Sequence, residues 1–226
     1  MRILVTAATA AELLPALEVW EVLRNQTNNS LYIDAVETGI GATATAYHTT
    51  KALTAQPYDM AINIGIAGSC GDSPPIGTVV RPLSDYFGDC GIQTASGFQS
   101  LFDAHLLHTD AFPFKSGKLT PPPLSPQWEA ALAPIPVANG ITVQHLTAAK
   151  NVRAGVRAGL CARPNQTNIE TMEGAAFFYV CLYESIPCIA LRAISNRAGE
   201  RDKSKWNIPL ALQSLKTALA ATLHSL

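Results

Sequence analysis

The run MAINIGIAG at residues 60–68 constrains the fold more than any other stretch of the chain. Its apolar residues do not alternate with polar ones, which is typical of a strand that is covered on both faces. Runs of the same kind lie at residues 3–8 and 188–195, and a helical pattern lies at residues 43–53. Because strands and helices alternate, we predict an α/β fold with a central, mostly mixed sheet flanked by helices. Further strands are expected at residues 31–39, 78–88, 142–150 and 168–172.

The end of the chain, at residues 207–226, predicts a closing amphipathic helix whose apolar stripe belongs to the core. The stripe consists of Leu212, Leu215, Leu219, Leu223 and Leu226. Residues 100–139 have many prolines and little periodicity, so we expect a long irregular excursion over the surface, of a kind that often borders a site or a subunit contact. Neither flank has a core pattern of its own, and we predict a single domain over residues 1–226.

Composition excludes several classes of function. With 16 basic and 17 acidic residues, the net charge of −1 provides no electrostatic footprint for nucleic acid or an anionic membrane, and a small-molecule partner is favoured. Glu184 and Pro187 interrupt the best candidate for a membrane span. The five cysteines are an odd number without a CxxC pair, which favours reduced thiols and a cytoplasmic location. The histidines have no metal-ligand spacing, so we expect no metal.

Glycines follow two of the expected strands. Gly39, Gly41 and Ala44 match GxGxxA, a weak fingerprint for a dinucleotide, and we expect no cofactor from it. The more modest interpretation is that free amides at the following helix start bind oxygen atoms. In NIGIAGS at residues 63–69 the chain leaves a buried strand through a tight turn that exposes Ser69, so Gly68 and Ser69 are candidate substrate-binding residues. The alternative is an ordinary strand-end turn.

Several pieces of the chain, taken in order, carry a family resemblance. They are Glu12 after the first strand, GIG at 39–41, NIGIAGS at 63–69, IGTVV at 76–80, ETMEGAA at 170–176 and LRAISN at 191–196. In this order and spacing the chain resembles the purine nucleosidase and nucleoside phosphorylase superfamily. Within it, ETMEGAA and RAISNRAGERDKSKW look most like the futalosine hydrolases, which are related to methylthioadenosine/S-adenosylhomocysteine nucleosidases.

The resemblance implies a three-layer α/β/α sandwich whose twisted mixed sheet partly closes on itself. A nucleoside would lie across the carboxyl ends of the strands, and the protein would be a homo-oligomer. The implied reaction is hydrolysis of the N-glycosidic bond of a 6-oxopurine nucleoside, futalosine, to release hypoxanthine in menaquinone biosynthesis.

The resemblance also implies roles for two acids and their neighbours. Glu173 would accept hydrogen bonds from the ribose 2′ and 3′ hydroxyls, with Met172 packed against the sugar. Because Glu173 is expected in the first turn of a helix, we expect free amides there to keep it ionised. Glu12 would direct and deprotonate the attacking water. For both residues the alternative role is helix stabilisation alone.

Asn196 stands where related enzymes that cleave 6-aminopurines carry an aspartate as general acid. An amide offers a paired donor and acceptor, which suits a 6-oxopurine, although Asn196 could also simply cap a strand end. If it only holds the base, Asp202 is the nearest candidate for the proton donor. One cation of the same stretch, for which Arg201 is our candidate, is expected to pair with the carboxylate at the far end of futalosine.

Three alternatives remain open at this point. A phosphate-dependent purine nucleoside phosphorylase is the close one, but residues 6–21 contain none of the basic residues that hold phosphate in such enzymes. A methylthioadenosine/S-adenosylhomocysteine nucleosidase is the second. A non-catalytic nucleoside-binding module is the distant one, and it has no need of Glu12 and Glu173 together.

Overall fold

The computed structural model describes residues 1–26, 31–95, 97–145, 168–200 and 202–226. Within these residues one sheet has the strand order β2-β1-β3-β8-β7-β4-β9, and β3 pairs with β9 as well. The extra pairing closes β3, β8, β7, β4 and β9 into a ring, while β1 and β2 extend beyond it. The strands are β1 (Arg2–Ala7), β2 (Tyr32–Glu37), β3 (Met60–Ser69), β4 (Val79–Ser84), β7 (Val137–Thr142), β8 (Asn168–Thr171) and β9 (Cys188–Arg197).

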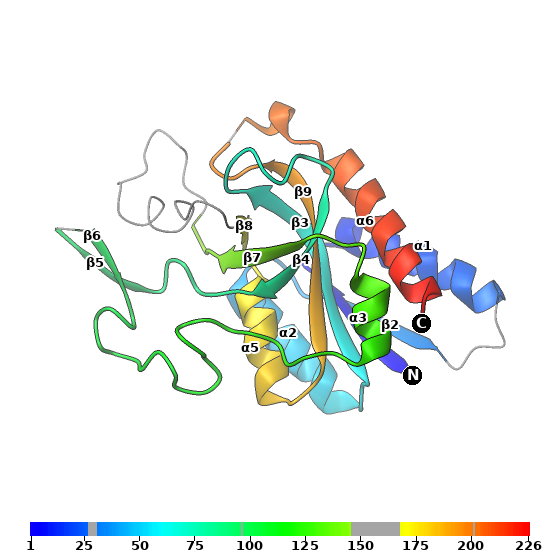
Figure 1. Ribbon diagram of the computed structural model, residues 1–226, viewed down its shortest axis with the longest axis horizontal. Coiled ribbons are helices and arrows are strands. Elements are labelled where there is room, and N and C mark those ends of the chain that lie inside the picture. The colour runs from blue at the N-terminus through cyan, green and yellow to red at the C-terminus, as the bar shows by residue number, and fades with distance from the viewer. Residues whose placement is uncertain (27–30, 96, 146–167, 201) are drawn as a thin grey trace.

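The sheet is mixed, as predicted. β1, β2, β3 and β9 run parallel to one another, whereas β8 is antiparallel to β3 and β4 is antiparallel to β9. A hairpin of β5 (Gly91–Thr94) and β6 (Gly97–Ser100) projects from the body in Figure 1.

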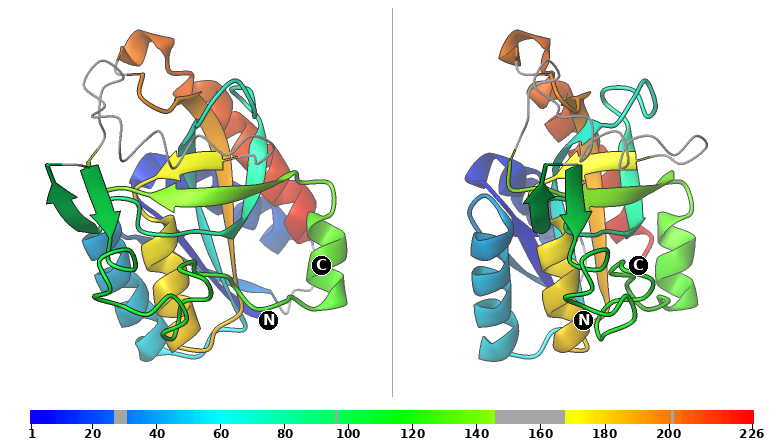
Figure 2. Two further views of the ribbon diagram at one scale, coloured as in Figure 1. Left: turned by 60° about the vertical axis from the view of Figure 1, so that its left-hand side comes forward. Right: turned by 90° about the vertical axis from the view of Figure 1, so that its left-hand side faces the viewer.

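Helices cover both faces of the sheet (Figures 1 and 2). One face carries α1 (Ala10–Gln26), α3 (Pro126–Leu132) and α6 (Ile208–His224), and the other carries α2 (Ala42–Ala55) and α5 (Gly174–Tyr183). A short 3-10 helix, η2 (Lys203–Lys205), follows β9. The result is the three-layer α/β/α arrangement that the resemblance implied.

The strands bury alternate residues on opposite faces. In β1, Ile3 and Val5 belong to the core beneath α1 and α6, while Leu4 belongs to the core beneath α2 and α5. All three side chains are fully buried. This explains why β1 shows no polar alternation, because neither of its faces meets water.

Two predictions about the middle of the chain were wrong. The strand expected at residues 142–150 is absent from residues 143–145, because β7 ends at Thr142, and residues 146–150 lie outside the described part of the chain. Residues 100–139 are not irregular throughout, because they contain α3 and the start of β7. α3 begins after Ser125 with Pro126 in its first turn, where a missing amide costs nothing, and it buries Trp128 and Leu132. Because of the high proline content, the sequence pattern did not predict this short helix.

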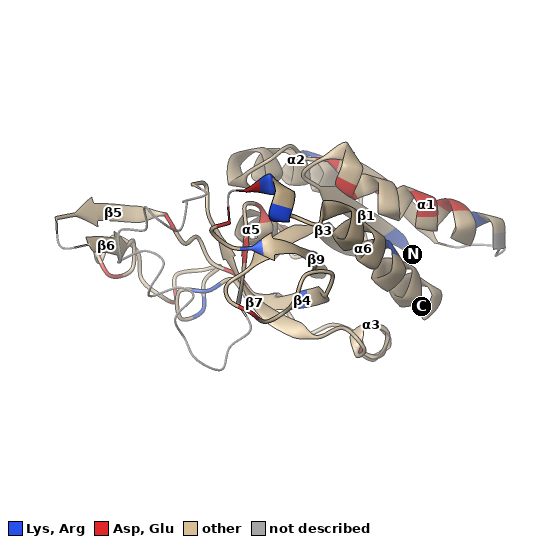
Figure 3. Ribbon diagram, turned by 90° about the horizontal axis from the view of Figure 1, so that it is seen from above, with Lys and Arg blue, Asp and Glu red and all other residues tan. Residues whose placement is uncertain are grey.

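The closing helix is confirmed as α6, and Leu215, Leu219 and Leu223 are buried on its stripe. Leu212 differs from the prediction, since it lines the candidate cavity described below. Charged residues of both signs are spread over the described elements in Figure 3. No helix among the described residues has the length and hydropathy required to span a membrane.

Candidate active site

A cavity of about 490 Å³ lies at the carboxyl ends of β3 and β9, beside the first turns of α1 and α5. Such strand ends are where α/β sheets usually bind ligands. The described residues that line it are Ala8, Thr9, Ala11, Glu12, Ile40, Ile66, Ala67, Gly68, Glu170, Thr171, Met172, Glu173, Ser195, Asn196, Gly199, Lys203, Trp206, Ile208 and Leu212. Glu12, Glu173 and Asn196, far apart in the sequence, therefore share one cavity.

Glu12 belongs to the first turn of α1, and only 9% of its surface is exposed. Its Oε1 accepts a hydrogen bond of 3.0 Å from the main-chain amide of Ile66 in β3, and its Oε2 accepts one of 2.8 Å from the hydroxyl of Thr9. A carboxylate that only capped α1 would turn back to the start of its own helix. Glu12 makes such a bond to Thr9, which precedes α1, and in addition bonds across to the sheet, which supports a role beyond helix stability.

Gly65 makes the approach of Glu12 to the sheet possible. A Cβ atom at Gly65 would lie 2.9 Å from Oε1 of Glu12, closer than real contacts allow. The first glycine of NIGIAGS thus leaves room for a catalytic candidate.

Glu173 is the residue that precedes α5, and its side chain makes no capping bond to that helix. Its Oε1 accepts a hydrogen bond of 2.9 Å from the amide of Gly41, and its Oε2 accepts one of 3.2 Å from the amide of Met172. Gly41 precedes α2, so the carboxylate lies at the amino terminus of α2. Our expectation that α5 would hold the carboxylate was wrong, because the side chain turns away from its own helix.

Burial raises the pKa of Glu173 above its ordinary value, and the negative charge of Glu12 adds to the increase. The amides of Gly41 and Met172 and the positive charge of Arg192 oppose it by favouring the ionised form. The expectation of a carboxylate stabilised by its surroundings therefore needs correction, since loss of water is the largest effect on this group.

The amides of the GxGxxA turn are already used within the protein. Gly41 donates to Glu173, and the amide of Ala42 donates to Oε1 of Gln144 at 3.2 Å. The helix-start amides therefore do bind oxygen atoms, but they are not free as the modest interpretation expected. Those oxygens belong to the chain itself, and these two amides are not free to bind a dinucleotide phosphate.

Arg192 is a charged residue at the site that the sequence analysis missed. It is 1% exposed in β9 and donates to the main-chain oxygen of Asn63 at 2.8 Å and to the side-chain oxygen of the same residue. Burial lowers the pKa of Arg192, and Glu173, Glu12 and Asp85 oppose that decrease in this order. An arginine inside the apolar run CIALRAIS was the available signal, because a buried charge requires partners.

Asp85 is the second residue that was missed. It follows β4, is 1% exposed, and its Oδ1 accepts hydrogen bonds from the amide of Tyr86 at 2.7 Å and the hydroxyl of Thr142 at 3.0 Å. Burial raises the pKa of Asp85 to about 7, helped by the charge of Glu173 and opposed by these hydrogen bonds and by Arg192. Nothing in its local sequence signalled burial.

Asn196 lies near the end of β9, is 6% exposed and lines the cavity. Its Oδ1 accepts a hydrogen bond of 2.7 Å from the Ser195 hydroxyl, and its Nδ2 donates one of 2.8 Å to the main-chain oxygen of Arg197. These bonds fix the plane of the amide. They leave one N–H and one lone pair of the side chain for a ligand.

The other candidate binding residues have different surroundings. Gly68 and Met172 line the cavity. Ser69 is not exposed as expected: it is 2% exposed and its hydroxyl donates to the carbonyl of Gly71 at 3.0 Å. It is absent from the described cavity lining.

The structure does not bring Asp202 into the cavity. Its exposed carboxylate accepts hydrogen bonds from the amide and hydroxyl of Ser204 at the start of η2, and these bonds lower its pKa. A proton donor needs the opposite shift, so the geometry argues against Asp202 in that role. Arg201 lies outside the described residues.

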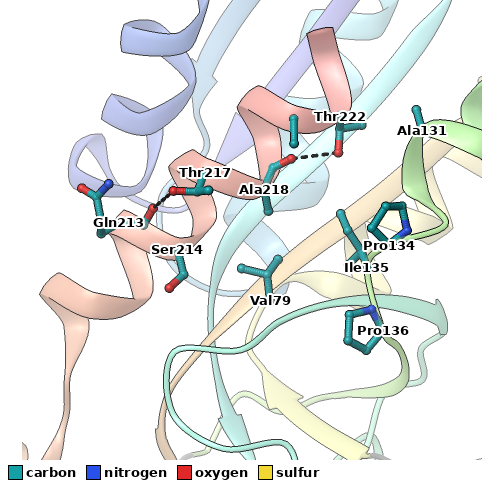
Figure 4. Close-up of a pocket in the computed structure, with 11 residues that line it drawn as sticks. Val79, Ala131, Pro134, Ile135, Pro136, Gln213, Ser214, Thr217, Ala218 and Thr222 are labelled. Carbon is teal, nitrogen blue, oxygen red and sulfur yellow. Dashed lines mark hydrogen bonds between the residues drawn. The ribbon is translucent and has the colours of Figure 1, made fainter. Parts of the chain in front are cut away.

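A second cavity, of about 370 Å³, lies between α3 and α6 (Figure 4). None of the described residues that line it has an ionisable side chain. Two of its hydroxyls are used within α6, where Thr217 donates to the carbonyl of Gln213 and Thr222 to that of Ala218. It lacks the groups that bond cleavage requires.

Comparison with known proteins places this geometry in a family. The family model described as the phosphorylase superfamily matches residues 26–224. A futalosine hydrolase of Streptomyces coelicolor is 29% identical over 192 residues, covering 82% of this chain and 76% of the relative. A futalosine hydrolase of Acidothermus cellulolyticus is 30% identical over 192 residues, covering 83% of this chain and 74% of the relative.

Solved structures agree on the fold. The native structure of futalosine hydrolase of Helicobacter pylori matches with a TM-score of 0.78 at 16% identity, covering 100% of this chain and 98% of that one. The 5′-methylthioadenosine/S-adenosylhomocysteine nucleosidase from Helicobacter pylori matches with a TM-score of 0.77 at 16% identity, covering 100% and 99%. The chain belongs to the phosphorylase superfamily and, within it, to the futalosine hydrolase family.

Proposed function

We propose that this protein is an N-glycosidic hydrolase that cleaves a 6-oxopurine nucleoside, futalosine, and releases hypoxanthine. The observation that carries the proposal is the meeting of Glu12, Glu173 and Asn196 in one cavity. The curated relatives named above are futalosine hydrolases, which supports the same substrate. Since futalosine belongs to menaquinone biosynthesis, the reaction would be a step of that pathway.

Glu173 is the ribose acceptor in this proposal. Its two oxygens each accept one main-chain amide, so each keeps a lone pair for a ribose hydroxyl. As the glycosidic bond lengthens, positive charge grows on the sugar, and the hydrogen bonds to a carboxylate become stronger. Glu12 and Glu173 outweigh the single charge of Arg192, so this part of the protein favours a developing cation.

Glu12 is the general base. Thr9 and Ile66 hold one oxygen each, which fixes the carboxylate while leaving lone pairs for a water molecule. Glu12 removes a proton from this water as its oxygen attacks the anomeric carbon. One water is consumed: its hydroxyl goes to the sugar and a proton goes to the leaving base.

Asn196 holds the base. Its remaining N–H faces the oxygen at position 6, and its remaining lone pair accepts the N7 proton of the leaving hypoxanthine. A 6-aminopurine would place a donor against a donor, which supports selection of the 6-oxo base.

Arg201, the candidate from the sequence, lies outside the described residues, and among those described Lys203 is the cation that we propose to bind the carboxylate at the far end of futalosine. Lys203 and Trp206 line the cavity together with Ile208 and Leu212. Two other cations of this stretch have acidic partners, because Arg197 pairs with Asp72, and Lys205 pairs with Glu200 at 3.0 Å. Trp206 offers a flat face to an aromatic substituent and Lys203 a charge beside it.

Water rather than phosphate is the proposed nucleophile. Around Glu12, the cavity is lined by the neutral residues Ala8, Thr9 and Ala11. The test is to incubate the protein with futalosine, inosine and methylthioadenosine, each with and without phosphate, and to identify the released base and sugar. Free hypoxanthine from futalosine without phosphate is expected. Phosphate-dependent formation of a sugar 1-phosphate would identify a phosphorylase, release of adenine an adenine nucleosidase, and binding without release a non-catalytic module.

We also propose a cytoplasmic homo-oligomer. Ile40 lines the cavity and is 65% exposed, and Phe112, also 65% exposed, packs edge-to-face against the half-exposed Tyr183. Such exposed apolar side chains are typical of subunit contacts. Light scattering on the purified protein would measure the mass, and a monomer at all concentrations would contradict this part.

A further inference from the structure

The start of α5 is held by residues other than Glu173. The amide of Ala175 donates to the hydroxyl oxygen of Thr142 at 2.7 Å, and the amide of Gly174 donates to that of Thr171 at 3.3 Å. Without such partners these first helical amides would be unsatisfied in a buried place. Because the two threonines take over the capping, the carboxylate of Glu173 is released toward Gly41 and the cavity.

Asp85 determines which way the Thr142 hydroxyl points. That hydroxyl has one proton, and it donates it to Oδ1 of Asp85 at 3.0 Å. Its lone pairs are thereby left for the amide of Ala175. The carboxylate itself is anchored, since Asp85 pairs through its main chain with Leu119 at 3.0 and 2.8 Å and its Oδ1 accepts from the amide of Tyr86.

Two glycines leave the space that the carboxylate of Asp85 occupies. A Cβ atom on either Gly140 or Gly174 would overlap Oδ2 of Asp85. Gly140 lies in β7 and Gly174 begins α5, so the carboxylate fills the gap between that strand and that helix. Gly174 in ETMEGAA is therefore required by the carboxylate of Asp85.

We propose that Asp85 is a positioning residue for the reaction: through Thr142 it holds the start of α5 so that Glu173 points at the ribose. The role rests on the proposed function, because it presumes that Glu173 binds the ribose hydroxyls. Both hydrogen bonds of the Asp85 side chain converge on Oδ1, so a proton on Oδ2 leaves them intact. The raised pKa of Asp85 is compatible with this arrangement, with Arg192 and Glu173 as the charged groups that act on it.

The test compares cleavage of inosine with cleavage of 2′-deoxyinosine, because the ratio of their kcat/KM values reports on the contact of Glu173 with the 2′ hydroxyl. Asp85→Ala and Thr142→Val are each expected to reduce this ratio about tenfold, as for the loss of a hydrogen bond to a charged group. Asp85→Asn keeps an oxygen at Oδ1 and is expected to keep the ratio. Asp103→Asn, at an exposed turn, is the matched control and should behave as the wild type.

A merely structural role would reduce both activities equally and leave the ratio unchanged. An unchanged ratio in Thr142→Val, which is nearly isosteric and leaves Asp85 in place, would overturn the proposal even if Asp85→Ala does not fold. An equal fall of the ratio in Asp85→Asn and in Asp85→Ala would also overturn the proposal. The charge of Asp85, rather than its positioning of Thr142, would then be responsible for the contact with the 2′ hydroxyl. If the wild type cleaves neither nucleoside and no futalosine, the proposed function has failed instead.

Discussion

The main-chain amide of Ile66 donates a hydrogen bond of 3.0 Å to the carboxylate of Glu12, which joins the first turn of α1 to the carboxyl end of β3. The bond fixes one oxygen of the carboxylate, and the hydroxyl of Thr9 fixes the other. An acid held on both oxygens keeps one orientation in the cavity. This is the property required of a group that directs a water molecule.

Glu12→Gln is expected to reduce kcat for futalosine by about 10²- to 10⁴-fold, because an amide does not accept the proton of the attacking water. The glutamine oxygen can still accept the amide of Ile66, so nucleoside binding is expected to persist. Hypoxanthine release and equilibrium binding measure the two effects. Glu21→Gln, on the exposed side of the same helix, is the control. Lost binding with normal turnover of the bound complex would refute the base assignment.

Gly65→Ala is expected to reduce kcat by about 10²-fold, because the added methyl group displaces Oε1 of Glu12 and misplaced catalytic groups lose rate steeply. The matched control is Gly71→Ala, since a Cβ atom there has no neighbour within 4 Å. Steady-state kinetics of both variants, with thermal melting to verify the fold, is the measurement. Normal kinetics in a folded Gly65→Ala protein would show that Glu12 does not depend on this space.

Asn196→Asp is expected to shift the preference from inosine toward adenosine and methylthioadenosine by about tenfold or more, because a carboxyl group can protonate N7 and accept from a 6-amino group. The kcat/KM values for these nucleosides are compared in wild type and variant. Asn207→Asp is the control, since Asn207 caps α6 through Oδ1 outside the cavity lining and aspartate caps equally well. If the preference does not move, Asn196 has no part in base selection.

Lys203→Met is expected to raise KM for futalosine about two- to fivefold, the effect of one exposed ion pair, and to leave KM for inosine unchanged. Raising the salt concentration should reduce the difference in the KM for futalosine between wild type and variant, since exposed charges are screened. Lys205→Met is the control, because Lys205 pairs with Glu200 and does not line the cavity. An equal change for both nucleosides would remove Lys203 from recognition of the far end.

The pKa of Asp85 predicts a pH dependence of stability. Its folded value of about 7 exceeds the ordinary 3.8, so between these values the native state binds more protons than the unfolded state. The free energy of unfolding should therefore fall as pH rises from about 4 to about 7, on the order of 4 kcal/mol from this group. Urea unfolding across that range measures it. The Asp85→Asn protein should lack this contribution, and an equally steep fall in the variant would show that other groups cause it.

The sequence by itself determined the α/β class, since buried strands such as residues 60–68 show their character in local composition. Motifs in a fixed order also predicted Glu12, Glu173 and Asn196 as site residues, and the structure brings all three to one cavity. A single domain over residues 1–226 stays a prediction. α3 was missed and β7 was misplaced, because prolines at residues 121–136 resemble an irregular segment until Trp128 and Leu132 have a core to enter.

Only the tertiary structure decided what surrounds these acids. The amide that holds Glu173 belongs to Gly41, 132 residues away, and the hydroxyl held by Asp85 belongs to Thr142, 57 residues away. Arg192 and Asp85 act on the site from inside the core, where loss of water raises the pKa of a carboxyl group. Local patterns report which face of an element is apolar. Hydrogen bonds, charges and burial at the site depend on how the closed sheet brings distant strand ends together.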